Sequence, residues 1–339
     1  MANVVDKAFS ATYGGANLNE IFYEPTFRSE DILANYRVIP NVKHKMNVFA
    51  AAPLTKIVAA YTGCSSSTTG GDLDLSDKTI EAGRCRVALE QCADEFFGTY
   101  IEELYRSGVD AMNVEGTAVG EIMTKRTVDG IGQDVVRLAW GADGSTADYD
   151  QFEGWIKLFG ADATINGAKI TEIAADIAAP TASDAINLIR NSYDKAPAAL
   201  QQIPAAEKKM FVTPKVYNAY LANLEGTSAD LAWSAQKDGV MKVSFRGVEL
   251  VPMYEFDTIL ADLNPTLFNG GTTPVDSNNG VIYCATQNLI IGTDVSDPQG
   301  QLKMWYEDKD EKVLVRSYFK LGVQFLFSSL VQVGLMVND

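Results

Sequence analysis

Lys209-Met-Phe-Val-Thr-Pro-Lys-Val-Tyr-Asn-Ala-Tyr-Leu221 is the stretch from which the fold of this chain can be argued. It opens with an apolar run that is typical of a buried strand. Thr213 followed by Pro214 is the pattern of a helix N-cap with proline in the first helical position. The sequence therefore predicts a strand over Lys209–Thr213 and a helix over Lys215–Leu224.

Strands dominate the chain after this stretch, and helices lie before it. Downstream strands are predicted at 240–253 (strand, turn and strand), 280–286, 288–293, 302–306, 313–320 and 324–337. Upstream helices are predicted at 90–107, 114–140 and 183–193. The order of elements gives a mixed α+β fold class.

Three further upstream features complete the prediction. Extended segments at 45–60 and 78–89 flank a Gly/Ser/Thr-rich tip, which predicts a long β-hairpin. The small residues of 160–169 predict a surface loop or a hairpin. Glycines at positions 120, 130 and 132 weaken the helix at 114–140, so we expect something packed closely against it.

The charge balance of the chain excludes several functions. Its 339 residues include 28 Lys and Arg against 44 Asp and Glu, a formal charge of −16. Nucleic-acid readers depend on clustered Lys and Arg, so this composition argues against that class. No stretch approaches the roughly 18 apolar residues of a membrane span, and the N-terminus lacks a signal-peptide pattern. We therefore expect a cytoplasmic product with reduced thiols.

A catalytic or metal-binding constellation is not apparent in the sequence. The single histidine, His44, excludes a two-histidine zinc site. The four cysteines form no C-x-x-C pair, and no P-loop, G-x-G-x-x-G, G-x-S-x-G or H-E-x-x-H pattern occurs. We expect no catalytic residue, no cofactor and no metal, and we expect that the chain is not an enzyme.

The hairpin and the N-terminal segment have no evident place on a single compact domain. The hairpin tip, residues 63–72, has almost no apolar side chain to pack, and a long hairpin of this kind is marginal on its own. The first forty residues also bury little by themselves. Both shapes are expected where they can lie on a neighbouring subunit. The tip residues predicted to contact that neighbour are Ser66, Thr68, Gly70 and Asp72.

Four stretches resemble the major capsid proteins of tailed bacteriophages, which have the Hong Kong 97-like fold. The opening stretch resembles the strand-then-helix segment of that family. Val243-Ser-Phe-Arg-Gly-Val-Glu-Leu-Val-Pro-Met253 resembles the segment that follows it. Asn288-Leu-Ile-Ile-Gly-Thr-Asp294 and Val315-Arg-Ser-Tyr-Phe-Lys-Leu-Gly-Val-Gln324 resemble its C-terminal pattern. The order of elements along nearly the whole chain is similar as well.

The resemblance implies a division of the chain into an arm, a projecting loop and two domains. These would be an N-terminal arm at 1–42, an extended E-loop hairpin at 43–89, a peripheral domain at 90–181 and 307–339 with its spine helix at 114–140, and an axial domain at 182–306. Forty residues before the hairpin are too few for a cleaved scaffolding region, so a separate scaffold, or none, is expected.

The resemblance also implies a function in the virion. The chain would be made in the host cytoplasm and would assemble, as hexamers and pentamers, into the icosahedral head shell of a tailed double-stranded DNA phage. It would enclose the genome without sequence-specific binding and without a membrane, and scaffold, portal and decoration proteins are further candidate partners. Two alternatives remain open: an encapsulin-like protein compartment, and an α+β small-molecule-binding protein with an unrecognised site.

Overall fold

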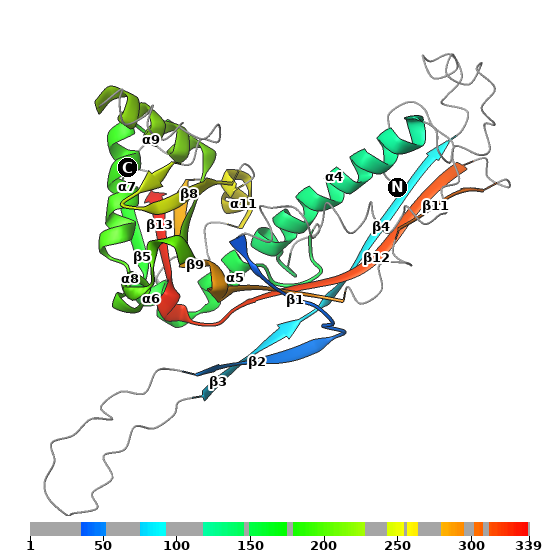
Figure 1. Ribbon diagram of the computed structural model, residues 1–339, viewed down its shortest axis with the longest axis horizontal. Helices are drawn as coiled ribbons and strands as arrows, with labels where there is room; N and C mark the ends of the chain where they lie inside the picture. Colours follow the sequence, from blue (N-terminus) through cyan, green and yellow to red (C-terminus); the bar gives the residue numbers. More distant parts are fainter. Residues whose placement is uncertain are drawn as a thin grey trace, which may run out of the picture.

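The computed structural model describes residues 35–51, 75–92, 118–145, 149–174, 179–227, 243–253, 256–263, 279–294, 302–307 and 312–337. These residues build one broad sheet covered by helices, one elongated sheet with a long helix beside it, and a separate hairpin, as Figure 1 shows. Residues 52–74 are not among the described residues, so the hairpin tip lies outside them.

The broad sheet has six strands in the order β5-β13-β9-β6-β8-β7. Its pairs β5–β13 and β6–β8 are parallel and its other pairs are antiparallel. Every residue of β9 is buried, which is the pattern of a strand covered on both faces. The strands are β5 (Ile170–Ala174), β6 (Lys208–Val212), β7 (Ser244–Phe245), β8 (Val248–Pro252), β9 (Gly280–Ala285) and β13 (Val331–Val337).

Two helices, α7 (Ala182–Asp194) and α9 (Pro214–Thr227), cover one face of this sheet, with the short α8 (Ala198–Gln202) between them in the chain. Thr181 begins α7 through a capping box with Asp184, which satisfies two backbone N–H groups at once. A Cβ atom on Gly334 of β13 would overlap the Ser192 side chain of α7, so the helix lies directly on the sheet there.

The elongated sheet has five strands and is built around β12, which pairs on one edge with β4 and on the other with β10 and β11. Alternate side chains of β4 and β12, among them Cys85 and Val315, pack with Ile131 and Val135 of α4 in the main core. Figure 1 shows α4 running beside these strands. The elements are β1 (Arg37–Ile39), β4 (Gly83–Cys92), β10 (Leu289–Thr293), β11 (Leu302–Glu307), β12 (Lys312–Phe325) and α4 (Ala118–Gly141).

A buried aromatic cluster joins the two sheets. Trp140 at the end of α4 lies 5.0 Å from the rings of both Trp155, in α5 (Trp155–Ala161), and Phe211 in β6. Its indole Nε1 donates a 2.9 Å hydrogen bond to the Tyr36 hydroxyl, which keeps the buried polar atom satisfied. Phe256 of α11 (Phe256–Leu263) completes the cluster at 5.3 Å from Trp140.

Most of the predicted elements are confirmed where the structure describes them. The stretch at 209–221 forms the end of the strand at 208–212 and the start of the helix at 214–227, as predicted. The long helix is found at 118–141. The expected helix at 90–107 is wrong at its start, because Glu90–Cys92 end β4, where they pair with residues 312–314 of β12. Residues 93–107 lie outside the described residues.

One local expectation is wrong, and another is not met at one of its three glycines. Residues 160–169 are largely helical rather than a loop or hairpin: α5 is followed by α6 (Ala163–Ala168). Asp162 accepts hydrogen bonds from the backbone N–H groups of Thr164 and Ile165, so it caps α6 despite the small-residue composition. A Cβ atom on Gly130 would have no described atom within 4 Å, so the close neighbour expected for the helix is not found at this glycine.

Candidate assembly surface

The β-hairpin formed by β2 (Lys45–Ala51) and β3 (Leu75–Glu81) presents two different faces. Because side chains alternate along a strand, Val48, Ala50 and Ile80 share one face. That face packs against the body in a small core: Ile80 is fully buried, and Val42 and Ile290 are its buried neighbours. The backbone N–H of Ala82 donates to the His44 carbonyl and closes the base.

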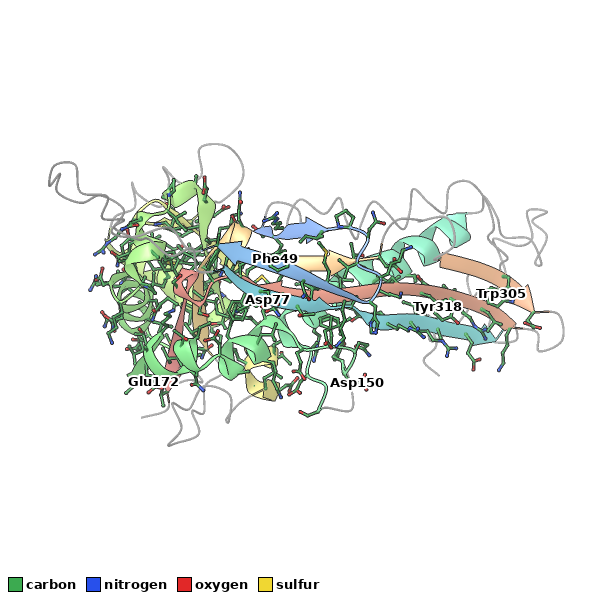
Figure 2. The ribbon with its side chains drawn as sticks, turned by 90° about the horizontal axis from the view of Figure 1, so that it is seen from below. Phe49, Asp77, Asp150, Glu172, Trp305 and Tyr318 are labelled. Carbon is green, nitrogen blue, oxygen red and sulfur yellow. The ribbon has the colours of Figure 1, made fainter. Side chains whose placement is uncertain are left out.

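The other face of the hairpin is open. Its side chains come from the directly opposed pairs Lys45 with Glu81, Asn47 with Thr79, and Phe49 with Asp77. The first pair is an ion pair, and the Thr79 hydroxyl lies 3.0 Å from the Asn47 Oδ1 atom. Phe49 is 71% exposed, and Figure 2 shows it on the same hairpin as Asp77. We call this face, with Lys45, Asn47, Phe49, Asp77, Thr79 and Glu81, the outer hairpin face.

Lys78 anchors the hairpin to the body. Its ammonium lies 3.4 Å from the centre of the Phe325 ring and 3.8 Å from the Asp162 carboxylate. Burial lowers the pKa of Lys78, and the negative charge of Asp162 opposes that shift only in part. Gln324 adds a 3.0 Å hydrogen bond from its side-chain amide to the Thr79 carbonyl. These contacts fix the direction of the hairpin from its base.

Asp162 is held as a carboxylate at this anchor. Burial by itself raises its pKa, but hydrogen bonds from the Ser328 hydroxyl and from the N–H groups of Thr164 and Ile165, together with the charge of Lys78, outweigh that effect. The pKa of Asp162 therefore lies below its ordinary value of 3.8. One carboxylate thus caps α6 and also holds the hairpin base.

Two glycines let the hairpin base pass directly over the elongated sheet. A Cβ atom on Gly322 of β12 would overlap the Glu81 carbonyl and lie 2.8 Å from its carbon, and one on Gly292 of β10 would lie 2.9 Å from the Ile80 side chain. Only Ala82 separates β3 from β4, so the chain leaves the hairpin and enters the sheet within one residue.

A groove lies between α4 and the elongated sheet. It has a volume of about 450 Å³, and its lining includes Cys85, Asp134, Leu138, Tyr149 and Phe319. Burial raises the pKa of the Cys85 thiol to about 12, so the thiol is not a ready nucleophile at neutral pH. Burial also raises the pKa of Asp134, while the Tyr149 hydroxyl, 3.4 Å away, and Arg137 oppose that shift. These groups do not form a nucleophile paired with a base.

Among the described residues, no three His, Cys, Asp or Glu side chains gather as a metal site would require. Within the same part of the chain, no helix combines the length and apolar character needed to cross a membrane.

The sequence located the hairpin but not its exposed contacts. The predicted contact residues Ser66, Thr68, Gly70 and Asp72 lie outside the described residues. Phe49 is not among the contact residues predicted from the sequence, although a signal exists: Val48 and Ala50 share the face that packs on the body, so the aromatic residue between them lies on the opposite face. The second extended segment of the hairpin, predicted at 78–89, belongs to two different strands, because residues 83–89 pair with β12 rather than with β2.

Solved structures to which this chain is similar include chains from phage capsids. A chain from the capsid of the cyanophage P-SCSP1u is 12% identical, covers 100% of this chain and 93% of that chain, and gives a TM-score of 0.54. A chain from the procapsid of satellite phage P4 is 10% identical, covers 99% and 95%, and gives 0.57. One from the capsid of Ralstonia phage GP4 is 12% identical, covers 100% and 93%, and gives 0.53.

Sequence comparison adds nothing to this result, because no protein-family model and no curated protein matches the chain. The structural matches extend over essentially the whole chain on both sides, so the likeness concerns the complete arrangement of sheets, long helix and hairpin. The chain has the fold of these phage capsid chains.

Proposed function

We propose that this chain is a major capsid protein that assembles into the icosahedral head shell of a tailed double-stranded DNA phage. One observation carries the proposal: over its full length the chain has the fold of chains found in phage capsids. The outer hairpin face supports it, because an exposed phenylalanine on a hairpin anchored at its base is suited to contact a neighbouring copy.

The proposed architecture is Hong Kong 97-like. Residues 43–89 would supply the extended loop, α4 the spine helix of the peripheral domain, and β6 to β9 with α7 and α9 much of the axial domain. An arm at 1–42 would reach a neighbouring subunit. The ordered hairpin base would set the direction in which the tip, with Ser66, Thr68, Gly70 and Asp72, meets that neighbour.

Assembly in this proposal uses many modest contacts. The hairpin and the surface that receives it differ, so the contact is head-to-tail and closes into rings such as hexamers and pentamers. Apolar area buried between copies contributes roughly 25 cal/mol per Å² before the entropic costs of association. Each copy makes several such contacts, so contacts too weak to hold two copies can still hold a closed shell.

The shell would enclose DNA without reading its sequence. A formal charge of −16 per copy disfavours adhesion of packaged DNA to the average surface. Scaffold, portal and decoration proteins are proposed as further partners. The proposed place of action is the virion, after synthesis in the host cytoplasm, and the proposed role is structural rather than enzymatic.

Electron microscopy and sedimentation of the purified chain, alone and with co-expressed phage head proteins, test the proposal. Closed particles are expected, and a monodisperse monomer under all conditions would refute it. Deleting Ser65–Gly71 is expected to leave the thermal melting of the monomer unchanged and to reduce particle yield. Nuclease-protected DNA inside particles produced during infection distinguishes a genome container from a compartment for protein cargo.

A further inference from the structure

The elongated sheet has a second face, on the side away from α4, and its chemistry is unusual for this chain. The side chains of Cys85, Val87 and Val315 point to the α4 side, so their neighbours along β4 and β12 point outward. The outward set includes three arginines and two aromatic residues, which we call the arginine strip: Arg84, Arg86, Trp305, Arg316 and Tyr318.

Contacts within the arginine strip hold it as one surface. Arg86 and Tyr318 are directly opposed across β4 and β12, and the guanidinium lies 6.0 Å from the centre of the tyrosine ring. The Arg316 guanidinium lies 5.3 Å from the centre of the Trp305 ring on β11. Tyr318 is 54% exposed, and Figure 2 labels it and Trp305 on neighbouring strands. These are cation–π geometries, which orient the guanidinium groups without neutralising them.

The positive charge of the strip is not balanced by carboxylates in the described part of the chain. Two lysines next to it are paired: Lys312 lies 3.6 Å from Glu90, and Lys320 lies 3.4 Å from Asp294. No ion pair joins Arg84, Arg86 or Arg316 to any described carboxylate. Three such arginines stand together in a chain in which Asp and Glu exceed Lys and Arg by sixteen.

We propose that the arginine strip is a docking surface for an acidic surface of a second copy of this chain. The inference rests on the proposed function, since it names one contact through which the copies associate. Copies with a charge of −16 repel one another, so a locally positive strip provides an attractive contact and also fixes which surfaces meet. Tryptophan, tyrosine and arginine are the residues that dominate binding energy at protein interfaces.

The composition of the strip favours a protein partner over DNA. Phosphate binding depends on the number of cations that contact the backbone, and strong binders use roughly six to ten contacts. The strip offers three arginines that form no ion pair with a described carboxylate, which is fewer cations than such binders use. A protein surface with a few carboxylates and apolar patches matches three arginines and two aromatic rings.

The test compares two triple variants that change the net charge equally. R84Q/R86Q/R316Q removes the arginines of the strip, and R190Q/K195Q/K215Q removes three exposed cations from α7, its C-cap and α9. The strip variant is expected to raise the critical concentration for assembly about tenfold, since exposed charge contacts are individually weak and three are lost per copy. The control variant is expected to assemble like the wild type. R84K/R86K/R316K keeps the charge and is expected to assemble nearly as well.

Salt supplies a second readout. Raising NaCl from about 0.1 M to about 1 M shortens the screening length from about 10 Å to about 3 Å. The tenfold difference between the strip variant and the wild type is therefore expected to shrink toward none. Equal assembly of the strip variant and the wild type at low salt would overturn the inference, as would an equal defect in the control variant. Normal assembly of the strip variant with less nuclease-protected DNA would also overturn it, in favour of a phosphate contact.

The inference and the proposed function can fail separately. A wild-type chain that forms no particle under any condition contradicts the proposed function alone. In that case, sedimentation equilibrium of the wild type and the strip variant still measures association between copies. Weaker association of the strip variant, but not of the control, supports the docking surface, and identical association refutes it.

Discussion

Replacing Phe49 by alanine should weaken assembly without destabilising the folded subunit. A phenylalanine side chain buries about 150–250 Å² when it is fully enclosed. Phe49 is 71% exposed, so about 100–180 Å² remains to be covered by a neighbour. At roughly 25 cal/mol per Å², complete coverage contributes about 2.5–4.5 kcal/mol per contact before ordering costs. We therefore expect Phe49→Ala to raise the critical concentration for assembly by about one hundredfold.

The same substitution should leave the stability of the folded subunit almost unchanged. The Phe49 side chain makes little contact with its own chain, and substitutions at such positions usually alter the free energy of unfolding by less than about 0.5 kcal/mol. Light scattering and electron microscopy measure the assembly threshold, and urea denaturation of the disassembled subunit measures stability.

Ile80→Val provides the matched control on the opposite face of the hairpin. Ile80 is fully buried, so losing one methylene is expected to cost about 0.5–1.5 kcal/mol of stability while the outer hairpin face stays intact. Assembly of Phe49→Ala at the wild-type concentration would refute the reasoning. A loss of stability in Phe49→Ala as large as that in Ile80→Val would contradict the assignment of the two faces.

Three further outcomes are expected. Gly322→Ala should lower the free energy of unfolding by about 1–3 kcal/mol in urea denaturation, because its Cβ would overlap the Glu81 backbone; unchanged stability would place the hairpin base elsewhere. The pKa of Asp162 in the folded state lies below 3.8, so its contribution to the free energy of unfolding is present above pH 3.8 and is lost as the pH falls toward the folded pKa. Asp162→Asn should therefore make stability fall less steeply with acid between about pH 6 and pH 3. An unchanged dependence on pH would contradict this. Trp140→Phe removes the donor to Tyr36 and should cost about 1–3 kcal/mol, followed by circular dichroism during denaturation; a neutral result would show that the bond adds nothing.

The sequence predicts the local elements of this fold well. Strong local signals explain this: an apolar run before Thr213-Pro214 gives β6 and then α9, and alternating apolar residues give the strands of the last third. The helices at 155–161 and 163–168 were not predicted because the first is only seven residues long, and Thr164, Asn166 and Gly167 in the second have low helix propensity. What forms them is tertiary, namely burial of Trp155 and Phe159 and the cap that Asp162 provides.

The candidate assembly surface was only partly predictable. The hairpin followed from strand patterns around a polar tip, but the identity of its inner face depends on residues far away in the sequence, such as Ile290. The arginine strip is invisible in the sequence for a related reason. Arg86 and Arg316 are 230 positions apart, and only the register of β4 with β12 brings them to one face. The net charge of −16 gave no hint of a local positive surface.

The single residue between β3 and β4 has a mechanical consequence. Tension on β3 of the hairpin passes through Ala82 straight into β4, along the direction of that strand. Ten consecutive register pairs join β4 to β12 in antiparallel order, from Gly83 with Leu321 to Cys92 with Lys312. A pull along the strand therefore strains these hydrogen bonds together in shear, whereas a pull across it would peel them one after another. The hairpin is connected to the body in the orientation in which a β-sheet resists force best.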